Sequence, residues 1–415
     1  MTESSPIAPL RVVVVGGGIA ALETVLALHE LAEAQLRVTL IAPEPDFVLR
    51  PLAVATPFSR GHANRLPLAE VMAEHSGRFI RSAVLRIDAA ARTVTLTTGD
   101  DVAYDVLVLA LGASAVPAFT HALTFGAHPE ALNGILADLE QGWSRSVAFV
   151  VPRGCSWPLP IYELALMTAE AVWSMNMDDV DMHLVTPERE PLEIFGTEAS
   201  AAVAQLLAGA RITVHHGAFA QVHPGGRIET GSGSEIAVEC VVALPVLEGP
   251  KLDGVPSSAQ GFIPVDDVGL VAGLDSVYAV GDATDRPIKQ GGLACQQADV
   301  TAAHIAATAG AGVEVPPLEQ VLRGRLLTGT RDRFLRRDPG EVAGAATAEP
   351  LWWPPEKVSG TYLSPYLVAK DVVHLSSRGG HAGPGIDVHV PLTRQQKRVH
   401  EDILGLSPLG PIVHC

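Results

Sequence analysis

The stretch that decides the fold is Val12–Glu23, which reads VVVVGGGIAALE. Its four valines predict a strand buried on both faces, and the apolar residues after the glycines predict a helix from Ala20 to Ala32. Strand, glycine-rich turn and helix in this order are typical of a dinucleotide-binding unit. In that unit Gly16 would allow the tight turn and Gly18 would let the backbone approach a pyrophosphate.

Small residues continue the pattern after the glycines. Ala21 would permit close packing of the helix on the strand, and Ala20 lies in the first turn of the helix. The N-terminus of this helix would offer free N–H groups and a partial positive charge to phosphates. The alternative is a glycine-rich turn that binds nothing.

One expected feature is displaced. A carboxylate that holds a ribose should end the second strand, predicted at Arg37–Ile41. That position is Ala42, and the nearest carboxylate is Glu44, two residues later. Glu44 therefore remains a candidate ribose ligand, with a solvated loop carboxylate as the alternative.

Strand and helix patterns alternate from Arg11 to about Ala309, which predicts an α/β fold with parallel sheets. A second round of the same plan begins with a buried strand at Val147–Val151. It continues with a helix at Tyr162–Trp173 and a strand at Asp181–Val185. Further buried strands are expected at 106–109 and 237–243, and strand and turn at 93–101. We interpret the two rounds as two Rossmann-like halves.

Composition narrows the function. The 415 residues include 29 basic and 46 acidic ones, for a net charge of -17, so nucleic acid is not an expected partner. The four cysteines form no CxxC pair or zinc spacing, and the histidines show no paired ligand spacing, so we expect no metal site. Few cysteines without pairing favour a reducing, cytoplasmic setting.

Two further stretches carry a family resemblance. Tyr104–Gly112 (YDVLVLALG) and Val277–Ala283 (VYAVGDA) resemble the second and third signatures of the pyridine nucleotide-disulfide oxidoreductase superfamily. With the glycine turn, the resemblance covers residues 11 to 310. It implies noncovalent FAD and an FAD-binding domain of residues 1–115 and 248–330. An NAD-type Rossmann-like domain of residues 116–247 would be inserted into it, and a C-terminal segment of residues 331–415 would follow.

The resemblance also implies a cofactor site. Asp282 would hydrogen-bond the ribityl chain of FAD, and the helix start after Lys289 would face the flavin. The full set of expected cofactor-binding residues is Gly16, Gly18, Ala20, Ala21, Glu44, Arg50, Ala110, Gly112, Gly281, Asp282, Gly292 and Leu293.

The second half lacks the glycines of a nicotinamide site. With Glu163 aligned to the Glu that usually follows them, the three glycine positions hold Ser156, Pro158 and Ile161. Prolines supply no N–H donor and bulky side chains block a pyrophosphate. Binding of NAD(P)H is therefore doubtful, although Glu188 occupies the place of a ribose-binding acid.

Two branches of the superfamily are nearest. Sulfide:quinone oxidoreductases carry a Pro-x-Tyr-Glu, matched at Pro160–Glu163, and a reactive Cys just before it. Cys155 lies nearby and is a candidate nucleophile, with a packing role as the alternative. No dithiol follows the first helix, which excludes the disulfide reductases.

Type II NADH:quinone dehydrogenases have a helix that Lys289 and Gln296 match, with Gly292 in place of a Gln. In that family this helix lies beside the flavin and the quinone. Lys289 and Gln296 therefore join Cys155 as candidate catalytic residues.

The expected function is an FAD-dependent oxidoreductase that moves two electrons from a small donor to a quinone, a protein or another acceptor. One alternative is an NAD(P)H-dependent enzyme with an altered nicotinamide site. Another is a non-catalytic flavoprotein that senses redox state. We expect a cytoplasmic protein with a contact to the inner face of the membrane as a further option. Arg331–Pro350 is expected to be a linker to an aromatic, proline-rich tail.

Overall fold

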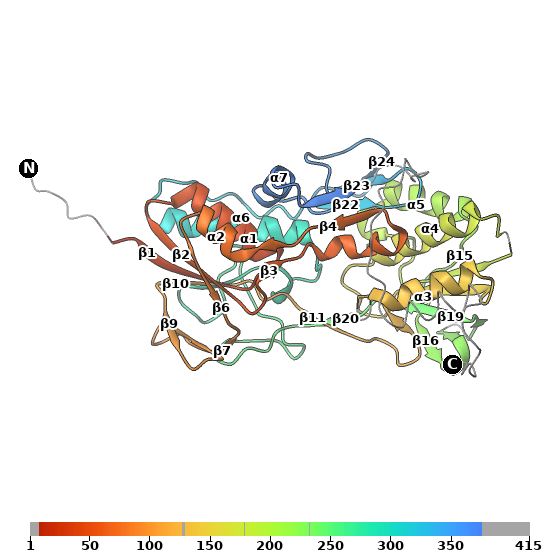
Figure 1. Ribbon diagram of the computed structural model, residues 1–415, viewed down its shortest axis with the longest axis horizontal. Coiled ribbons are helices and arrows are strands. Elements are labelled where there is room, and N and C mark those ends of the chain that lie inside the picture. Colours follow the sequence, from red (N-terminus) through yellow and green to blue (C-terminus); the bar gives the residue numbers. More distant parts are fainter. Residues whose placement is uncertain (1–7, 127–128, 178, 232, 376–415) are drawn as a thin grey trace, which may run out of the picture. The chain divides into compact units, whose positions relative to one another are not determined.

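Two parallel sheets of five strands organise the part of the chain that the computed structural model describes, residues 8–126, 129–177, 179–231 and 233–375 (Figure 1). The first sheet has the order β21-β10-β1-β2-β6, and every neighbouring pair is parallel. Its strands are β1 (Leu10–Val15), β2 (Leu36–Ala42), β6 (Arg78–Arg81), β10 (Val106–Leu109) and β21 (Val277–Ala279).

The second sheet repeats the plan of the first. Its order is β12-β19-β13-β14-β15, again parallel throughout. The central strand is β1 in the first sheet, with β2 and β6 on one side of it, and β13 in the second sheet, with β14 and β15 on one side of it. The strands are β12 (Leu123–Thr124), β13 (Ser146–Val150), β14 (Asp181–Val185), β15 (Thr213–His215) and β19 (Cys240–Ala243). The prediction of two Rossmann-like halves is confirmed.

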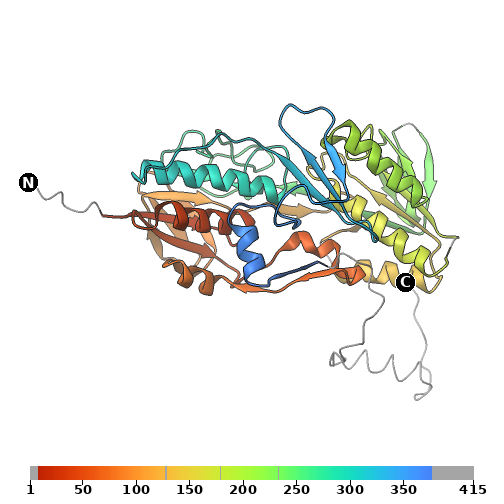
Figure 2. The ribbon, with the colours of Figure 1, turned by 90° about the horizontal axis from the view of Figure 1, so that it is seen from above.

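Alternate residues of the first sheet face different layers. Val12 and Val14 pack against helices, whereas Val13 and Val15 pack against a small antiparallel sheet. The helices α1 and α6 lie side by side along the first face (Figure 2). The covering elements are α1 (Ile19–Ala32), α2 (Leu68–Glu74) and α6 (Gly291–Thr308) on one face, and β7 (Val84–Asp88), β8 (Thr93–Leu96) and β9 (Asp101–Ala103) on the other.

The second sheet is covered in the same way. Val147 and Phe149 belong to the helical side, and Ala148 and Val150 to the side of an antiparallel sheet. The covering elements are α3 (Pro129–Glu140), α4 (Leu159–Ser174), α5 (Thr197–Gly209), β16 (Ala220–His223), β17 (Arg227–Thr230) and β18 (Glu235–Ala237).

The chain passes between the halves twice, through β11 (Ser114–Val116) and β20 (Val246–Glu248). These two crossovers pair with each other as antiparallel strands. The first sheet is thus built from residues on both sides of the second half. The exact domain boundaries at residues 115, 247 and 330 stay predictions.

Short elements complete the first half. They are the strand pair β3 (Asp46–Phe47) with β5 (Leu66–Pro67), the strand β4 (Gly61–Ala63), and 3-10 helices at Arg50–Val54, Thr56–Phe58 and Gly281–Ala283. Two further 3-10 helices lie in the second half, at Glu193–Phe195 and Pro224–Gly226.

The C-terminal segment differs from the expected linker. It folds into an antiparallel sheet of β22 (Leu322–Leu326), β23 (Arg333–Arg337) and β24 (Ala345–Thr347). The charged residues that suggested a linker make local pairs, such as Arg336 with Asp338 at 2.9 Å. The segment then forms α7 (Leu363–Ala369) and β25 (Val373–Leu375), which pairs with β4. Residues 376–415 of the predicted tail lie outside the described residues.

Two predicted boundaries need correction. Helix α4 begins at Leu159 rather than Tyr162, because a proline such as Pro160 is tolerated in the first turn of a helix. The strand expected at 237–243 is two strands, since β18 ends at Ala237 and β19 begins at Cys240.

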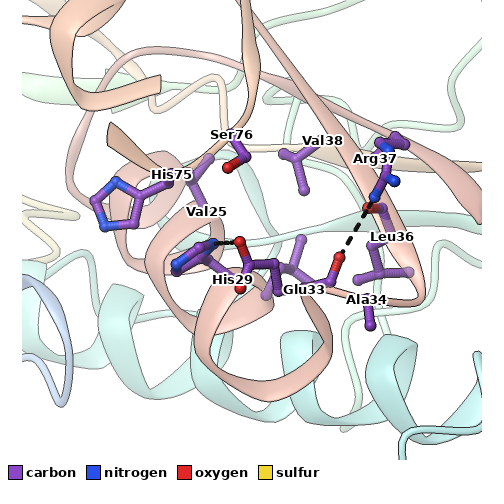
Figure 3. Close-up of a pocket in the computed structure, with 10 residues that line it drawn as sticks. Val25, His29, Glu33, Ala34, Leu36, Arg37, Val38, His75 and Ser76 are labelled. Carbon is purple, nitrogen blue, oxygen red and sulfur yellow. Dashed lines mark hydrogen bonds and ion pairs between the residues drawn. The ribbon is translucent and has the colours of Figure 1, made fainter. Parts of the chain in front are cut away.

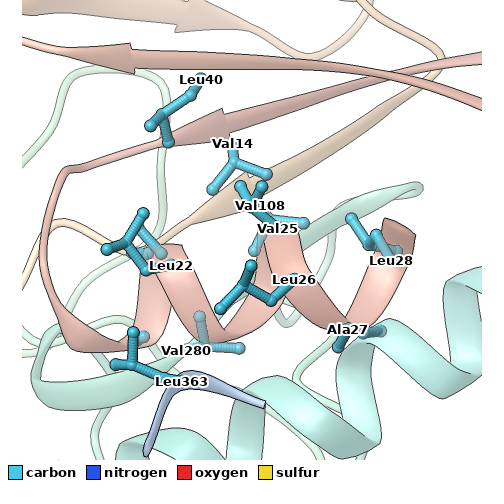
Figure 4. Packing of buried hydrophobic residues seen from close by; sticks show 14 of the residues in the cluster. Val14, Leu22, Val25, Leu26, Ala27, Leu28, Leu40, Val108, Val280 and Leu363 are labelled. Atoms are coloured by element: carbon cyan, nitrogen blue, oxygen red, sulfur yellow. The ribbon is translucent and has the colours of Figure 1, made fainter. Parts of the chain in front are cut away.

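The packing of α1 on the first sheet generates a stability prediction (Figure 4). Leu22 is fully buried in this cluster, so Leu22→Ala should lower the free energy of unfolding by about 2–5 kcal/mol. Leu85→Ala is the control, because Leu85 is 58% exposed and its loss should change that free energy by about 0.5 kcal/mol or less. Urea denaturation measures both, and equal effects would contradict the packing described.

Candidate functional site

The turn between β1 and α1 makes a close backbone approach. Gly16 has a φ of +125°, and a Cβ there would lie 2.1 Å from the carbonyl oxygen of Ala110. Only glycine fits this position. Around Gly18, by contrast, an added Cβ would meet nothing within 4 Å. Gly18 is the N-cap of α1 and no side chain caps the helix. Its first N–H groups are therefore available to a phosphate.

The ends of β2 and β10 lie at the same edge of the first sheet as this turn. Glu44 and Arg50 follow β2, and both are exposed. Within the described residues neither side chain has a hydrogen-bond or ion-pair partner. Gly112 follows β10 with a φ of +69° and open space at its Cβ position. These residues leave room and free polar groups at the carboxyl edge, where such folds bind ligands.

Asp282 follows β21 at the same edge. Gly281 before it has a φ of +73°, and a Cβ there would lie 2.9 Å from the Cβ of Ala20. The Gly281 N–H donates to Oε1 of Gln297 at 2.8 Å, which holds the turn. Burial raises the pKa of the Asp282 carboxyl, and Lys289 opposes that shift. No described group donates a hydrogen bond to this carboxylate, so it is free to accept one from a ligand.

Lys289 is buried beside Asp282. Its ammonium donates to the carbonyl oxygen of Thr284 and lies 3.9 Å from the centroid of the Phe262 ring. Burial lowers the pKa of Lys289 to about 8, although the charges of Asp282 and Asp285 oppose the shift. The structure thus brings two of the predicted site residues together, a cation and an unpartnered carboxylate.

The start of α6 is partly occupied by its own side chains. Gln290 caps the helix by accepting the N–H of Leu293 at 2.7 Å. The Gln296 amide bonds Val321 through both its nitrogen, at 3.0 Å, and its oxygen, at 2.9 Å. Gln296 therefore anchors the chain before β22, a role that its sequence motif did not indicate.

These residues fit a dinucleotide with a ribityl chain. The uncapped N-terminus of α1 can receive the pyrophosphate, Glu44 can accept from a ribose hydroxyl, and Asp282 can accept from a ribityl hydroxyl. The carboxyl edge of the first sheet therefore offers an uncapped helix N-terminus and two free carboxylates that fit these parts of FAD.

The corresponding turn in the second half is closed. Helix α4 begins after Pro158, and Pro160 in its first turn has no N–H. The Ile161 N–H already bonds the carbonyl oxygen of Pro158 at 3.1 Å, and the Ile161 side chain is fully buried. Trp157 packs on Phe195 with ring centroids 5.6 Å apart. Pro158, Pro160 and the bonded N–H of Ile161 therefore leave few donors for a second pyrophosphate.

Glu188 lies in the turn after β14, and its carboxylate is hydrogen-bonded within the second half. The Tyr162 hydroxyl donates to Oε2 of Glu188 at 2.6 Å, and the Thr186 hydroxyl donates to the same oxygen at 2.9 Å. Burial raises the pKa of Glu188 to about 7 despite these bonds. In the sequence, Tyr162 belongs to the Pro-x-Tyr-Glu motif and Glu188 occupies the place of a ribose-binding acid. No local pattern predicts a hydrogen bond between these two residues, which are 26 positions apart.

Cys155 lies in the closed turn. Burial, more than any charge, raises the pKa of its thiol to about 11, so the thiol is protonated at neutral pH. It packs against an apolar cluster that also contains Ile288 and Leu293, residues that flank the start of α6. The nearby charge of Glu188 also disfavours the thiolate.

A cavity of about 450 Å³ opens at the other end of α1, away from the glycine turn (Figure 3). His29 and Glu33 lie on one side of it, and Arg37, Val38 and Ser76 on the other. It does not belong to the cofactor site. In the described residues no three His, Cys, Asp or Glu side chains are arranged to hold a metal ion. Every helix in those residues is too short or too polar to span a bilayer.

The sequence matches the family model described as pyridine nucleotide-disulphide oxidoreductase over residues 10–139 and 163–309. The chain belongs to this family. It is 29% identical over 294 residues to an NADH dehydrogenase-like protein of Mycobacterium tuberculosis, covering 66% of this chain and 72% of that protein. A sulfide-quinone reductase of Aquifex aeolicus is 34% identical over 104 residues, 25% of this chain and 24% of that protein.

Solved structures of the family share the fold. The sulfide:quinone oxidoreductase of Aquifex aeolicus superposes with a TM-score of 0.73 at 20% identity, covering 87% of this chain and 90% of that one. NDH2 of Plasmodium falciparum superposes with a TM-score of 0.63 at 12% identity, covering 81% and 92%.

Membership in this family confirms the predictions of family, fold class and cofactor. The family and fold class are confirmed, and the protein is an enzyme, an oxidoreductase that binds FAD noncovalently. The individual cofactor-binding and catalytic residues stay predictions, as do the donor and the acceptor of electrons.

The open space at Gly18 generates a cofactor prediction. Gly18→Trp should abolish FAD binding, because an indole would fill the place of the pyrophosphate. The variant should still fold, since its Cβ meets nothing within 4 Å. Gly209→Trp, at an equally open glycine on α5, should keep FAD. Flavin absorbance of the purified variants decides, and a flavin-loaded Gly18→Trp would show that the pyrophosphate lies elsewhere.

The unpartnered carboxylate generates another prediction. Asp282→Ala should weaken FAD binding by about 1.5–3 kcal/mol, the usual worth of a hydrogen bond to a charged group. Asp275→Ala, at an exposed carboxylate, serves as the control and should bind FAD as the parent does. Titration of the apoprotein with FAD measures both, and unchanged affinity in Asp282→Ala would remove this residue from the site.

Proposed function

We propose that the protein passes two electrons from a small donor to a quinone or another acceptor, and that neither NADH nor NADPH is an efficient donor. FAD supplies the two-electron chemistry when bound. The observation that carries the proposal is the closed N-terminus of α4. With Pro158 before the helix, Pro160 inside it and the Ile161 N–H already bonded, a second dinucleotide would lack its usual anchor.

The residues of the chain would divide the work in the first half. The N-terminus of α1 would hold the pyrophosphate, and Asp282 would orient the ribityl chain. Lys289, buried beside Asp282, would place a positive charge at the cofactor site, where it would stabilise negative charge. Cys155 would act on a sulfur-based donor only if a ligand or motion lowered its pKa, because burial keeps the thiol protonated.

A second candidate retains NAD(P)H as the donor in an altered binding mode. Two observations favour it: the similarity to a protein named NADH dehydrogenase-like, and the position of Glu188 in the turn after β14. For Glu188 to hold a ribose, however, it would have to exchange the hydroxyls of Tyr162 and Thr186 for those of the ligand. The first candidate needs no such rearrangement.

A quinone acceptor would imply contact with a membrane surface. The C-terminal segment offers two exposed apolar side chains for that contact, Trp353 at 86% and Val342 at 72% exposure. We therefore include a cytoplasmic location with peripheral attachment to the inner face of the membrane in the proposal.

Anaerobic stopped-flow reduction tests the donor. NADH and NADPH should reduce the bound flavin slowly or not at all, with affinity no better than about 1 mM, roughly 4 kcal/mol of binding. Sulfide is the small donor to compare. Saturable reduction by micromolar NADH or NADPH at roughly tens per second would favour the second candidate.

The variant Glu188→Gln separates the two candidates further. If Glu188 holds a ribose, the variant should lose reduction by NAD(P)H while keeping reduction by sulfide. If the second half binds no dinucleotide, the rates of flavin reduction by NADH, NADPH and sulfide should keep the same order in the variant as in the parent.

A further inference from the structure

A short segment, residues 358–369, lies across α1 and α6, and we call it the strap. Val358 packs on Ile19 and Gly291, at the starts of the two helices that border the cofactor site. A Cβ at Gly360 would lie 2.5 Å from Oε2 of Glu23 and 2.9 Å from Sγ of Cys295. The strap backbone is thus pressed directly onto a fully buried carboxylate and a fully buried thiol.

Glu23 of α1 caps the helix of the strap. Its Oε1 accepts the N–H of Tyr362 at 2.9 Å, and its Oε2 accepts the N–H of Leu363 at 2.7 Å. No side chain of the strap caps α7. A charged carboxylate at a helix start favours the helix, so Glu23 is most useful to this contact when it is ionised.

Asp299 of α6 completes the contact and differs from Glu23 in its donors. Its Oδ2 accepts the Thr361 hydroxyl at 2.7 Å. Its Oδ1 is buried and receives no hydrogen bond from any described group, and the Glu23 carboxylate neighbours it. A buried carboxyl oxygen that receives no hydrogen bond and lies beside a second carboxylate is more stable when it is protonated. A protonated Asp299 can donate to Glu23 and leave Glu23 charged.

Among the residues that the structure describes, no cation pairs with Glu23 or Asp299. The titratable groups that act on the pair itself are Cys295 on α6, Tyr362 on the strap and, toward Tyr362, Glu30 on α1, and all three are acidic. Farther along the strap, Tyr366 donates to Glu74 at 2.8 Å and packs against the His75 ring, while Lys370, just after the strap, pairs with Glu74. Burial first, and then the charge of Glu23, raises the pKa of Asp299 to about 8.

The direction of the pH effect follows from this shift. A docked strap holds the proton of Asp299 more tightly than an exposed carboxyl would, so docking is favoured at low pH. Docking weakens as the pH rises, and above about 8 two charged carboxylates face each other under the strap.

We propose that Glu23 and Asp299 form a proton-controlled latch: one shared proton keeps the strap docked on α1 and α6, and loss of that proton at alkaline pH releases it. Release would uncover Cys295 and the starts of both helices beside the cofactor site. The latch would thereby couple the exposure of that site to the pH around the protein.

The accessibility of Cys295 tests the latch in the FAD-loaded protein. We would treat the parent and Asp299→Asn with a maleimide and follow the Cys295 peptide by mass spectrometry. The Asn amide can donate to Glu23 at every pH and so mimics the protonated state. At about pH 9 the parent should react at least about tenfold faster than Asp299→Asn, and near pH 6.5 the two should agree within about twofold.

Comparison at one pH cancels the intrinsic pH dependence of the reagent. Loss of the Asp299 charge would by itself make the thiol more reactive, so it cannot produce the expected slow labelling of Asp299→Asn. Equal rates at about pH 9, or fast labelling of the parent at both pH values, would overturn the proposal. If Asp299→Asn fails to fold, Asp299→Ala removes the same repulsion while leaving both Glu23 oxygens to cap the strap, and it should also label more slowly than the parent at about pH 9.

Discussion

The approach of the Gly16 backbone to the carbonyl oxygen of Ala110 is the constraint on which the cofactor site depends. A distance that excludes even a methyl group lets the chain leave β1 directly beside β10 and start α1 at the sheet edge. That position directs the uncapped end of α1 toward the same edge that carries Asp282. At the proposed site, backbone geometry would therefore hold a pyrophosphate before any side chain takes part.

The sequence predicted what local patterns determine. Valine runs and glycine spacing indicated the strands of both sheets and the turn after β1, and Tyr104–Gly112 and Val277–Ala283 indicated the family. It could not predict contacts between distant residues. The hydrogen bonds from Tyr362 and Leu363 to Glu23 join positions more than 300 residues apart, and no periodicity records them. The charge-rich stretch Arg331–Pro350 looked like a linker because its pairing becomes visible only when β23 and β24 join β22 in a sheet.

The two halves share one fold but differ at the helix start that follows the central strand of each sheet. In the first half the helix start after the glycine turn is open, whereas in the second prolines, Ile161 and Trp157 fill the equivalent space. Both sheets nevertheless have a buried apolar cluster on each face. Stability of a dinucleotide fold thus rests on its layers, and ligand binding rests on a few residues at one edge.

The insertion of the second half into the first bears on the order of events during synthesis. Strands β12 to β19 occupy one continuous stretch of chain, so that half can assemble as soon as it leaves the ribosome. The first sheet must wait for β21, and α1 must wait for α6 before its neighbouring face is covered. The nascent chain therefore carries an unfinished N-terminal sheet for much of translation. The proposed cofactor site, which includes Asp282, is complete only after most of the polypeptide exists.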